Sequence, residues 1–210
     1  MVGTNEDQVV LLAGIGGQGI QVAGKTLANA AVYERKRALY YSLFDGGQRG
    51  GVSDCIVALS ETEITTPPLI KQPCASLFAM DPNGLTRYEG MVRSGGLVVY
   101  NRSVREVQRF RYEADGATTT GETRVAREDL DVIELSATEL SAEHFGNPLM
   151  AAMILLGALI ERTGIVSQES AKLALHDAIR PGRHRFIPVN EQALELGAEL
   201  APELLGIPLA

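Results

Sequence analysis

Short hydrophobic runs alternate with helical patterns along the first half of the chain. The run "VVLLAGI" at 9–15 is continuously apolar and ends in glycines, as strands buried on both faces do. Further strand-like runs lie at 38–45, 52–59, 75–81, 95–101 and 130–136. A helix over about 19–33 is predicted from apolar or small residues on one helical face: Ile20, Ala23, Gly24, Leu27, Ala30 and Ala31.

The second half is dominated by helical patterns, at 137–145, 148–163, 167–179 and 190–200. The helix at 148–163 carries its own boundary signals, with Asn147 as N-cap, Pro148 in the first turn and Gly164 after its end. The polar stretch 109–129 is expected to be a hairpin or loop. Together these patterns predict an α/β fold in one domain, 1–210. We expect a Rossmann-like open, mostly parallel sheet with helices on both faces and a helical C-terminal part.

Composition and charge narrow the class of protein. The chain has 210 residues and a formal net charge of -7, without a long basic run, which disfavours nucleic-acid binding. Cys55 and Cys74 lie too far apart to ligate a metal or an iron–sulfur cluster by themselves, so we expect no metal site and reduced thiols. The polar N-terminus is unlike a signal peptide, and the longest apolar run (148–160) is too short for a membrane span, so a cytoplasmic protein is expected.

The stretch "GIGGQGIQVAGKT" at 14–26 satisfies two phosphate-binding motifs at once. Gly19, Gly24, Lys25 and Thr26 fit the Walker A pattern G-x-x-x-x-G-K-T. That motif requires the lysine and threonine to open the helix. Here the helical spacing begins at about residue 19, which places Lys25 nearly two turns into it. A P-loop NTPase is therefore a disfavoured alternative.

The second motif is G-x-G-x-x-G, at Gly14, Gly16 and Gly19, which lies between a predicted strand and a predicted helix. Asp45, at the end of the next strand, could complete a dinucleotide site, so a stand-alone NAD- or flavin-binding oxidoreductase stays an alternative. A tight turn that needs glycine only for packing is also open. The residues by themselves indicate a helix N-terminus suited to an anion of unspecified kind.

Four segments in order resemble the gamma subunits of 2-oxoacid:ferredoxin oxidoreductases, the enzymes that act on pyruvate, 2-oxoglutarate, ketoisovalerate, indolepyruvate and phenylglyoxylate. These segments are "GIGGQGIQVAGKTLANAA" (14–31), "DGGQRGGVSDCIVALS" (45–60), "NPLMAAMILLGAL" (147–159) and "RFIPVNEQALELG" (185–197). The second resembles the family's Gly-x-x-Arg-Gly-Gly-x-Ser pattern, and the last resembles its closing Asn and Ala-x-x-x-Gly.

The resemblance implies that this chain does part of the chemistry of a larger enzyme. That enzyme oxidatively decarboxylates a 2-oxoacid to acyl-coenzyme A and passes electrons to ferredoxin or a related acceptor. Thiamine diphosphate, magnesium and iron–sulfur clusters are implied on partner subunits of alpha, beta and delta type, with coenzyme A as a shared substrate. A further subunit with flavin that passes electrons to NAD stays open. The gamma subunit is expected to bind no cofactor alone, to close over the active site and to help hold coenzyme A.

The resemblance also nominates binding residues, and no catalytic residue, in this chain. Phosphates of coenzyme A are expected at Gly14, Gly16, Gly17, Gln18, Gly19, Lys25, Arg49, Gly50 and Gly51. Lys25 as a solvated helix residue, and Arg49 paired with Asp45 or Asp54, remain alternatives. The basic stretch "RPGRHR" (180–185) is interpreted as surface or subunit interface.

Overall fold

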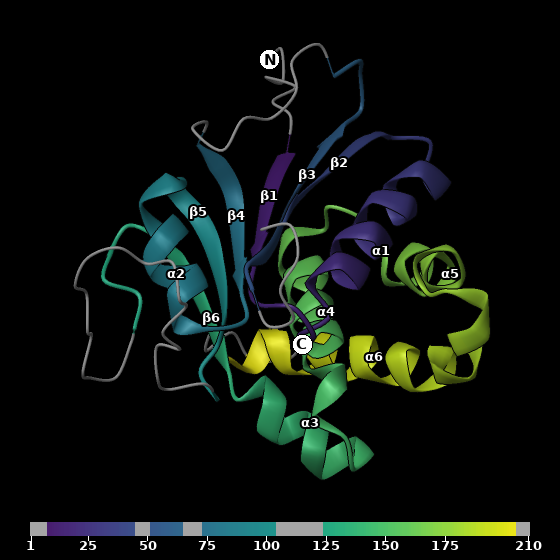
Figure 1. Ribbon diagram of the computed structural model, residues 1–210. Helices are drawn as coiled ribbons and strands as arrows, with labels where there is room; N and C mark the ends of the chain where they lie inside the picture. Colours follow the sequence, from purple (N-terminus) through teal and green to yellow (C-terminus); the bar gives the residue numbers. More distant parts are fainter. Residues whose placement is uncertain (1–7, 45–50, 65–72, 104–123, 205–210) are drawn as a thin grey trace.

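A single mixed sheet organises the described part of the chain. The computed structural model describes residues 8–44, 51–64, 73–103 and 124–204. Within them, six strands lie in the order β2-β3-β1-β4-β5-β6 (Figure 1). Their bounds are β1 Gln8–Ala13, β2 Arg37–Phe44, β3 Ser53–Ser60, β4 Cys74–Ala79, β5 Val92–Asn101 and β6 Asp131–Leu135. The pairs β1–β4, β4–β5 and β5–β6 are parallel, whereas β3 runs antiparallel to both of its neighbours.

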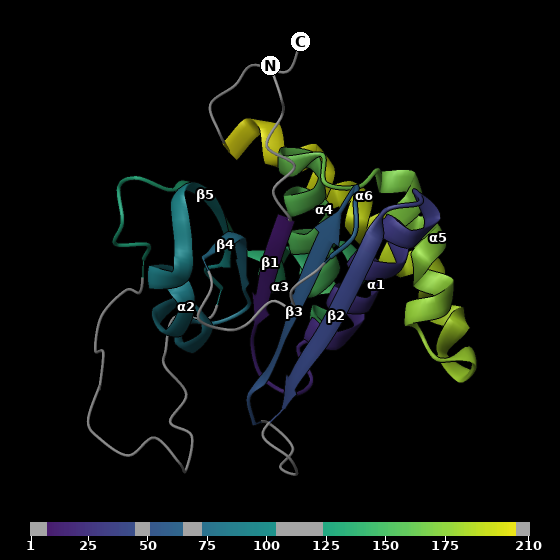
Figure 2. The same cartoon turned by 90° about the horizontal axis from the view of Figure 1, so that it is seen from above.

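Helices cover the two faces of this sheet unequally (Figures 1 and 2). One face is covered by α1 (Ile20–Tyr33), α4 (Ala151–Thr163), α5 (Gln168–Ala178) and α6 (Ile187–Leu204). The other face carries α2 (Pro82–Tyr88) and the 3-10 turn η1 (Glu89–Met91). The remaining elements are α3 (Ala137–Phe145) and the 3-10 segments η2 (Pro148–Met150) and η3 (Pro181–Phe186).

The predicted α/β class, with a mostly parallel sheet and a helical C-terminal part, is confirmed. The antiparallel direction of β3 is not among the predictions, because an apolar run does not reveal strand direction. Boundaries shift by a few residues: β1 ends at Ala13, and α6 begins at Ile187 rather than at 190. Asp45 and most of the polar stretch 109–129 lie outside the described residues.

Strand β1 shows why a continuous apolar run is needed. Val10 and Leu12 are buried in the larger core beneath α1 and α4. Leu11 and Ala13 point into the smaller core beneath α2. Since successive strand residues face opposite sides, a strand covered on both faces must be apolar at every position.

Helices α4 and α6 cross with their backbones in contact. A Cβ built on Gly157 would lie 2.0 Å from the carbonyl oxygen of Leu194, and one on Gly197 would lie 1.8 Å from that of Ile154. No side chain fits at either position, so both glycines are required for the approach itself. Both belong to segments that carried the family resemblance, "LLGAL" and "LELG". The crossing fixes how α6 and the preceding η3 sit against α4.

None of the helices in the described ranges combines the length and hydropathy needed to cross a bilayer.

We expect Gly157→Ala to lower the free energy of unfolding by about 3 kcal/mol, because the new methyl group must push the two helices apart. Gly90→Ala is the matched control. A Cβ there meets no atom within 4 Å, so the change should stay within about 0.5 kcal/mol. Chemical denaturation of the two variants measures the difference. Equal stabilities would contradict the close crossing.

Candidate functional site

The glycine loop at 14–19 is tied to the start of β3 along its length. The amide of Ser53 donates to the Gly14 carbonyl oxygen at 2.9 Å, and the amide of Gly16 donates to the Gly51 carbonyl oxygen at 2.8 Å. Between them, Ile15 and Val52 form an isolated bridge. The glycine loop and Gly51 therefore lie side by side at one edge of the sheet. Arg49 and Gly50, expected beside them, lie outside the described residues.

Gln18 folds back onto its own loop. Its Oε1 accepts from the Ile15 amide at 2.8 Å, and its own amide donates to the Ile15 carbonyl oxygen at 3.1 Å. The backbone turns at Gly17 and Gly19, with φ of 103° and 86°, a region that strongly favours glycine. Gln18 thus closes the loop.

Two backbone amides of this loop have no hydrogen-bond acceptor among the described residues, those of Gly17 and Gly19. Gly19 is the N-cap of α1 and has no side chain to cap the helix. The first-turn amides of a helix carry partial positive charge and attract anions. The Gly16 and Gln18 amides are already engaged, so the capacity to bind an anion rests with Gly17, Gly19 and the first turn of α1.

The residues of the Walker A pattern are dispersed rather than gathered. Gly24 packs on the sheet, where a Cβ would lie 2.5 Å from the Cys55 Sγ. Lys25 is exposed, and its Nζ lies 6.0 Å from the centroid of the Tyr40 ring. Thr26 is fully buried, and its hydroxyl has no partner among the described residues. These residues therefore do not form a P-loop, because none of the three lies at the N-terminus of α1.

The inserted strand β3 also argues against a dinucleotide site. In such sites the acid that binds the ribose ends the strand adjacent to the glycine-loop strand. Here β3 lies between β1 and β2, so the end of β2 is two strand spacings, about 10 Å, from β1. The acid that does lie against the glycine loop is Asp54, on β3.

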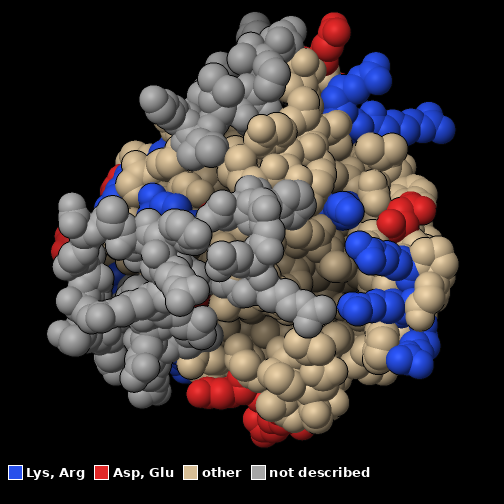
Figure 3. Space-filling model, in the orientation of Figure 1, with Lys and Arg blue, Asp and Glu red and all other residues tan. Residues whose placement is uncertain are grey.

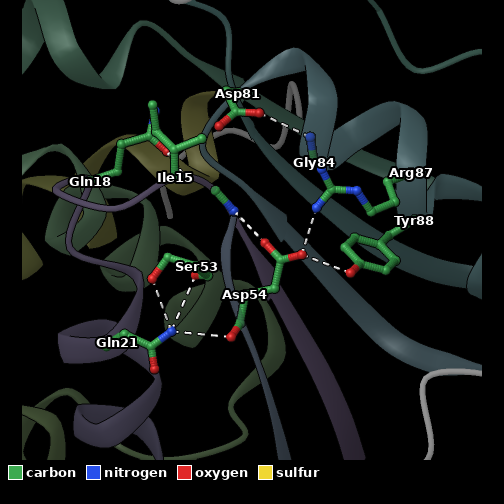
Figure 4. A network of polar contacts seen from close by, with 10 residues as sticks. Ile15, Gln18, Gln21, Ser53, Asp54, Asp81, Gly84, Arg87 and Tyr88 are labelled. Atoms are coloured by element: carbon green, nitrogen blue, oxygen red, sulfur yellow. Dashed lines mark hydrogen bonds and ion pairs between the residues drawn. The ribbon is translucent and has the colours of Figure 1, made fainter. Parts of the chain in front are cut away.

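Asp54 joins the glycine loop to α2 (Figure 4). Its side chain is fully buried. Oδ1 accepts from the Gly14 amide at 3.0 Å, and Oδ2 accepts from Arg87 Nη1 and from the Tyr88 hydroxyl, each at 2.7 Å. Burial, and then the Asp54 charge, raise the pKa of Tyr88 to about 12, so its hydroxyl remains a donor at neutral pH. Sequence reasoning missed Asp54 as a site residue; the signal is an acid inside the apolar run 52–59.

Two further residues complete this network. Gln21, in the first turn of α1, donates through Nε2 to the carbonyl oxygens of Ser53 and Asp54 and to the Ser53 hydroxyl, at 3.1–3.2 Å. Asp81 caps α2 by accepting from the Gly84 amide at 3.0 Å. Burial, with the Asp54 charge contributing, raises the pKa of the Asp81 carboxyl. The network holds α1, β3 and α2 around the loop.

A pocket of about 200 Å³ opens beside the glycine loop. Residues at or near the N-terminal ends of three segments line it: α1, η2–α4 and η3–α6. Its walls are largely apolar, formed by Val22, Leu149, Met150, Ala152, Met153, Ile179 and Phe186. Its other lining residues are Gly17, Gly19, Asn147, Arg183 and Asn190.

Of the predicted site residues that the structure describes, Gly17 and Gly19 line the pocket. Gly14, Gly16, Gln18 and Gly51 shape the loop behind it, and Lys25 is not among the lining residues. Sequence reasoning does not place Arg183 in a site, because "RPGRHR" indicates only a basic surface. Asn147 and Asn190 lie in segments that resemble the family, but the resemblance gives them no shared location.

Comparison with known proteins identifies the class. The pyruvate ferredoxin/flavodoxin oxidoreductase family model matches residues 9–200, so the chain belongs to that family. The 2-oxoglutarate synthase subunit KorC of Methanothermobacter thermautotrophicus is 31% identical over 92% of this chain and 95% of its own length. This chain is accordingly a gamma-type subunit of a multi-subunit 2-oxoacid:ferredoxin oxidoreductase.

Solved structures share the fold. The gamma subunit of a keto/oxoacid ferredoxin oxidoreductase from Geobacter sulfurreducens has a TM-score of 0.74 at 22% identity, covering 95% of this chain and 98% of that one. The 2-oxoglutarate:ferredoxin oxidoreductase of Magnetococcus marinus, with 2-oxoglutarate, coenzyme A and succinyl-CoA bound, has a TM-score of 0.73 at 20% identity. The match covers 95% of this chain but 32% of that longer chain. The fold thus occurs both as a separate subunit and as one part of a larger chain.

We expect Asp54→Asn to lower the free energy of unfolding by about 3 kcal/mol, because it leaves the Arg87 guanidinium without its buried counter-charge. Asp129→Asn is the matched control. Asp129 pairs with Arg127 at 2.6 Å but is 45% exposed, so solvent screens the pair and its loss should cost much less than the loss of Asp54. Urea titration of both variants tests this. A loss at Asp54 no larger than at Asp129 would contradict the role of the buried pair.

Proposed function

We propose that this chain is the coenzyme A-binding gamma subunit of a 2-oxoacid oxidoreductase, and that it closes over an active site held by its partners. Alpha, beta and delta-type subunits would hold thiamine diphosphate, magnesium and iron–sulfur clusters, which supply the decarboxylation and the electron transfer. Among the described residues, no group of three or more His, Cys, Asp or Glu side chains could hold a metal. What this chain contributes is a place for the acyl acceptor.

The observation that carries the proposal is the convergence of the family-like segments on one pocket. The glycine loop, the segment that begins at Asn147 and the segment that holds Asn190 all line it. The fourth segment meets the loop through the hydrogen bond from Gly16 to Gly51. Segments far apart in the chain that resemble a family and share one cavity indicate a common ligand.

The chemistry of the pocket suits coenzyme A. That molecule combines a pyrophosphate with an apolar, flat base and a long amide-containing arm. The free amides of Gly17 and Gly19 at the start of α1 suit a phosphate. The methionine and isoleucine wall suits the uncharged parts. The Magnetococcus relative, whose fold this chain shares, contains bound coenzyme A.

A charge placed at the mouth of the pocket tests the proposal. Leu149 lines the pocket and is 62% exposed, so a polar side chain there should not disturb the fold. In the assembled complex, we expect Leu149→Glu to raise the KM for coenzyme A about three- to tenfold, because its carboxylate repels the phosphates. Steady-state kinetics with varied coenzyme A, at saturating 2-oxoacid, measure the effect.

Leu149→Gln, of equal size and without charge, is the control and should change the KM less than about twofold. Gel filtration of both variants checks that partner subunits remain bound. Should Leu149→Glu assemble normally and keep an unchanged KM for coenzyme A, the chain would be a structural subunit at this position rather than a binding one.

A further inference from the structure

The segment around η3 gathers positive charge in an acidic protein. Arg180, Arg183 and Arg185 lie within six residues, together with His184, although the whole chain has a net charge of -7. Arg87, Arg127 and Arg162 each pair with an aspartate. The three arginines around η3 form no ion pair with any acid among the described residues. Cationic side chains gather beside a hollow on the face drawn in Figure 3. Unneutralised charge of this kind favours an anionic ligand.

Of these three arginines, Arg183 alone lines the pocket. Its position is fixed from several sides: its amide donates to the Arg180 carbonyl oxygen at 2.8 Å, and the His184 Nε2 lies 2.9 Å from the Ile179 carbonyl oxygen. The Asn190 amide group donates to the Phe186 carbonyl oxygen at 2.6 Å. The backbone that carries Arg183 is therefore held in place, and its exposed side chain shares the pocket lining with Gly17 and Gly19.

The remaining lining of the pocket suits a flat aromatic ring that bears a hydrogen-bond donor. Met150, Met153 and Ile179 supply apolar contact. Asn190 is only 7% exposed, and its Oδ1 accepts no hydrogen bond from the described residues. An unpaired amide oxygen in a pocket wall can accept a hydrogen bond from a ligand donor. An adenine amino group is such a donor.

We propose that Arg183 binds the 3′-phosphate of coenzyme A, so that this pocket distinguishes coenzyme A from dephospho-coenzyme A. The glycine amides take the pyrophosphate and the apolar lining takes the adenine. The ribose of coenzyme A carries both the pyrophosphate and the 3′-phosphate. This explains why the pocket has two separate anion-binding features, the glycine amides and Arg183. A guanidinium can form two parallel hydrogen bonds to one phosphate group, which adds specificity to charge. This inference rests on the proposed function, because it assumes that coenzyme A occupies the pocket.

The test compares two ligands on the assembled complex. Calorimetric titration without 2-oxoacid gives the Kd for coenzyme A and for dephospho-coenzyme A, and steady-state kinetics give the KM for each. The wild-type complex should bind dephospho-coenzyme A about tenfold more weakly. Arg183→Gln should weaken coenzyme A binding about tenfold and leave dephospho-coenzyme A within about twofold, so that the discrimination disappears.

Arg180→Gln is the matched control, because it removes the same charge from the same stretch but not from the pocket lining. It should keep the wild-type discrimination. Arg183→Lys retains the positive charge without the planar guanidinium group. It should discriminate between the two ligands better than Arg183→Gln does, and it also shows whether the position tolerates substitution.

Each of the following results would overturn the inference. A wild-type complex that binds the two ligands equally has no 3′-phosphate site. Equal weakening of both ligands by Arg183→Gln would assign Arg183 to the pyrophosphate or to the general field of the pocket. If neither Arg183→Gln nor Leu149→Glu changes the Kd or KM of either ligand, coenzyme A does not enter this pocket and the proposed function itself fails. If Arg183→Gln has no effect on either ligand but Leu149→Glu raises the KM for coenzyme A, the proposed function stands and only the assignment of Arg183 is wrong.

Discussion

The contact between the backbones of α4 and α6 is the constraint on which the C-terminal half depends. Because Gly157 and Gly197 carry no side chain, each helix lies directly on a carbonyl oxygen of the other. Gly157 lies about two turns after the start of α4, and Gly197 lies about three turns after the start of α6. Both helices begin beside the pocket. The close approach therefore sets the distance between Asn147 at the start of one and Asn190 near the start of the other. Two glycines outside the pocket lining thus help to set the width of the pocket.

The glycine loop depends on a different kind of interaction, a buried charge. Asp54 has no exposed surface, so its carboxylate requires the guanidinium of Arg87 and the donors of Tyr88 and Gly14. This arrangement links the first loop of the sheet to α2 on the opposite face. The antiparallel β3 makes it possible, because its first residues lie at the edge where parallel β1 ends.

The sequence predicts the strands and helices whose hydrophobic residues recur periodically. It does not predict features that depend on contacts with residues far away in the chain. The apolar run of β1 and the buried face of α1 are predictable because two-sided burial and helical spacing leave local patterns. The direction of β3 is not predictable, since its pattern is the same whichever way it runs. Gly19 is found through the G-x-G-x-x-G motif and Gly17 through the family resemblance of its segment, whereas nothing in the sequence places Arg183 and Asn190 beside the glycine loop. The α4–α6 crossing brings the segment that holds them against α4, and no short-range spacing in the sequence records that contact.

The pocket joins the first loop of the chain to one of its last segments, and this has a consequence for biosynthesis. Gly17 and Gly19 are synthesised well before Arg183 and Asn190, and most of the helix that holds Asn190 is synthesised later still. The cavity cannot exist on a nascent chain that lacks α6, because contacts of such long range form only when both ends are present. A chain without α6 lacks Asn190 and the α4–α6 contact. The complete pocket therefore forms only after α6 has been synthesised and has packed on α4.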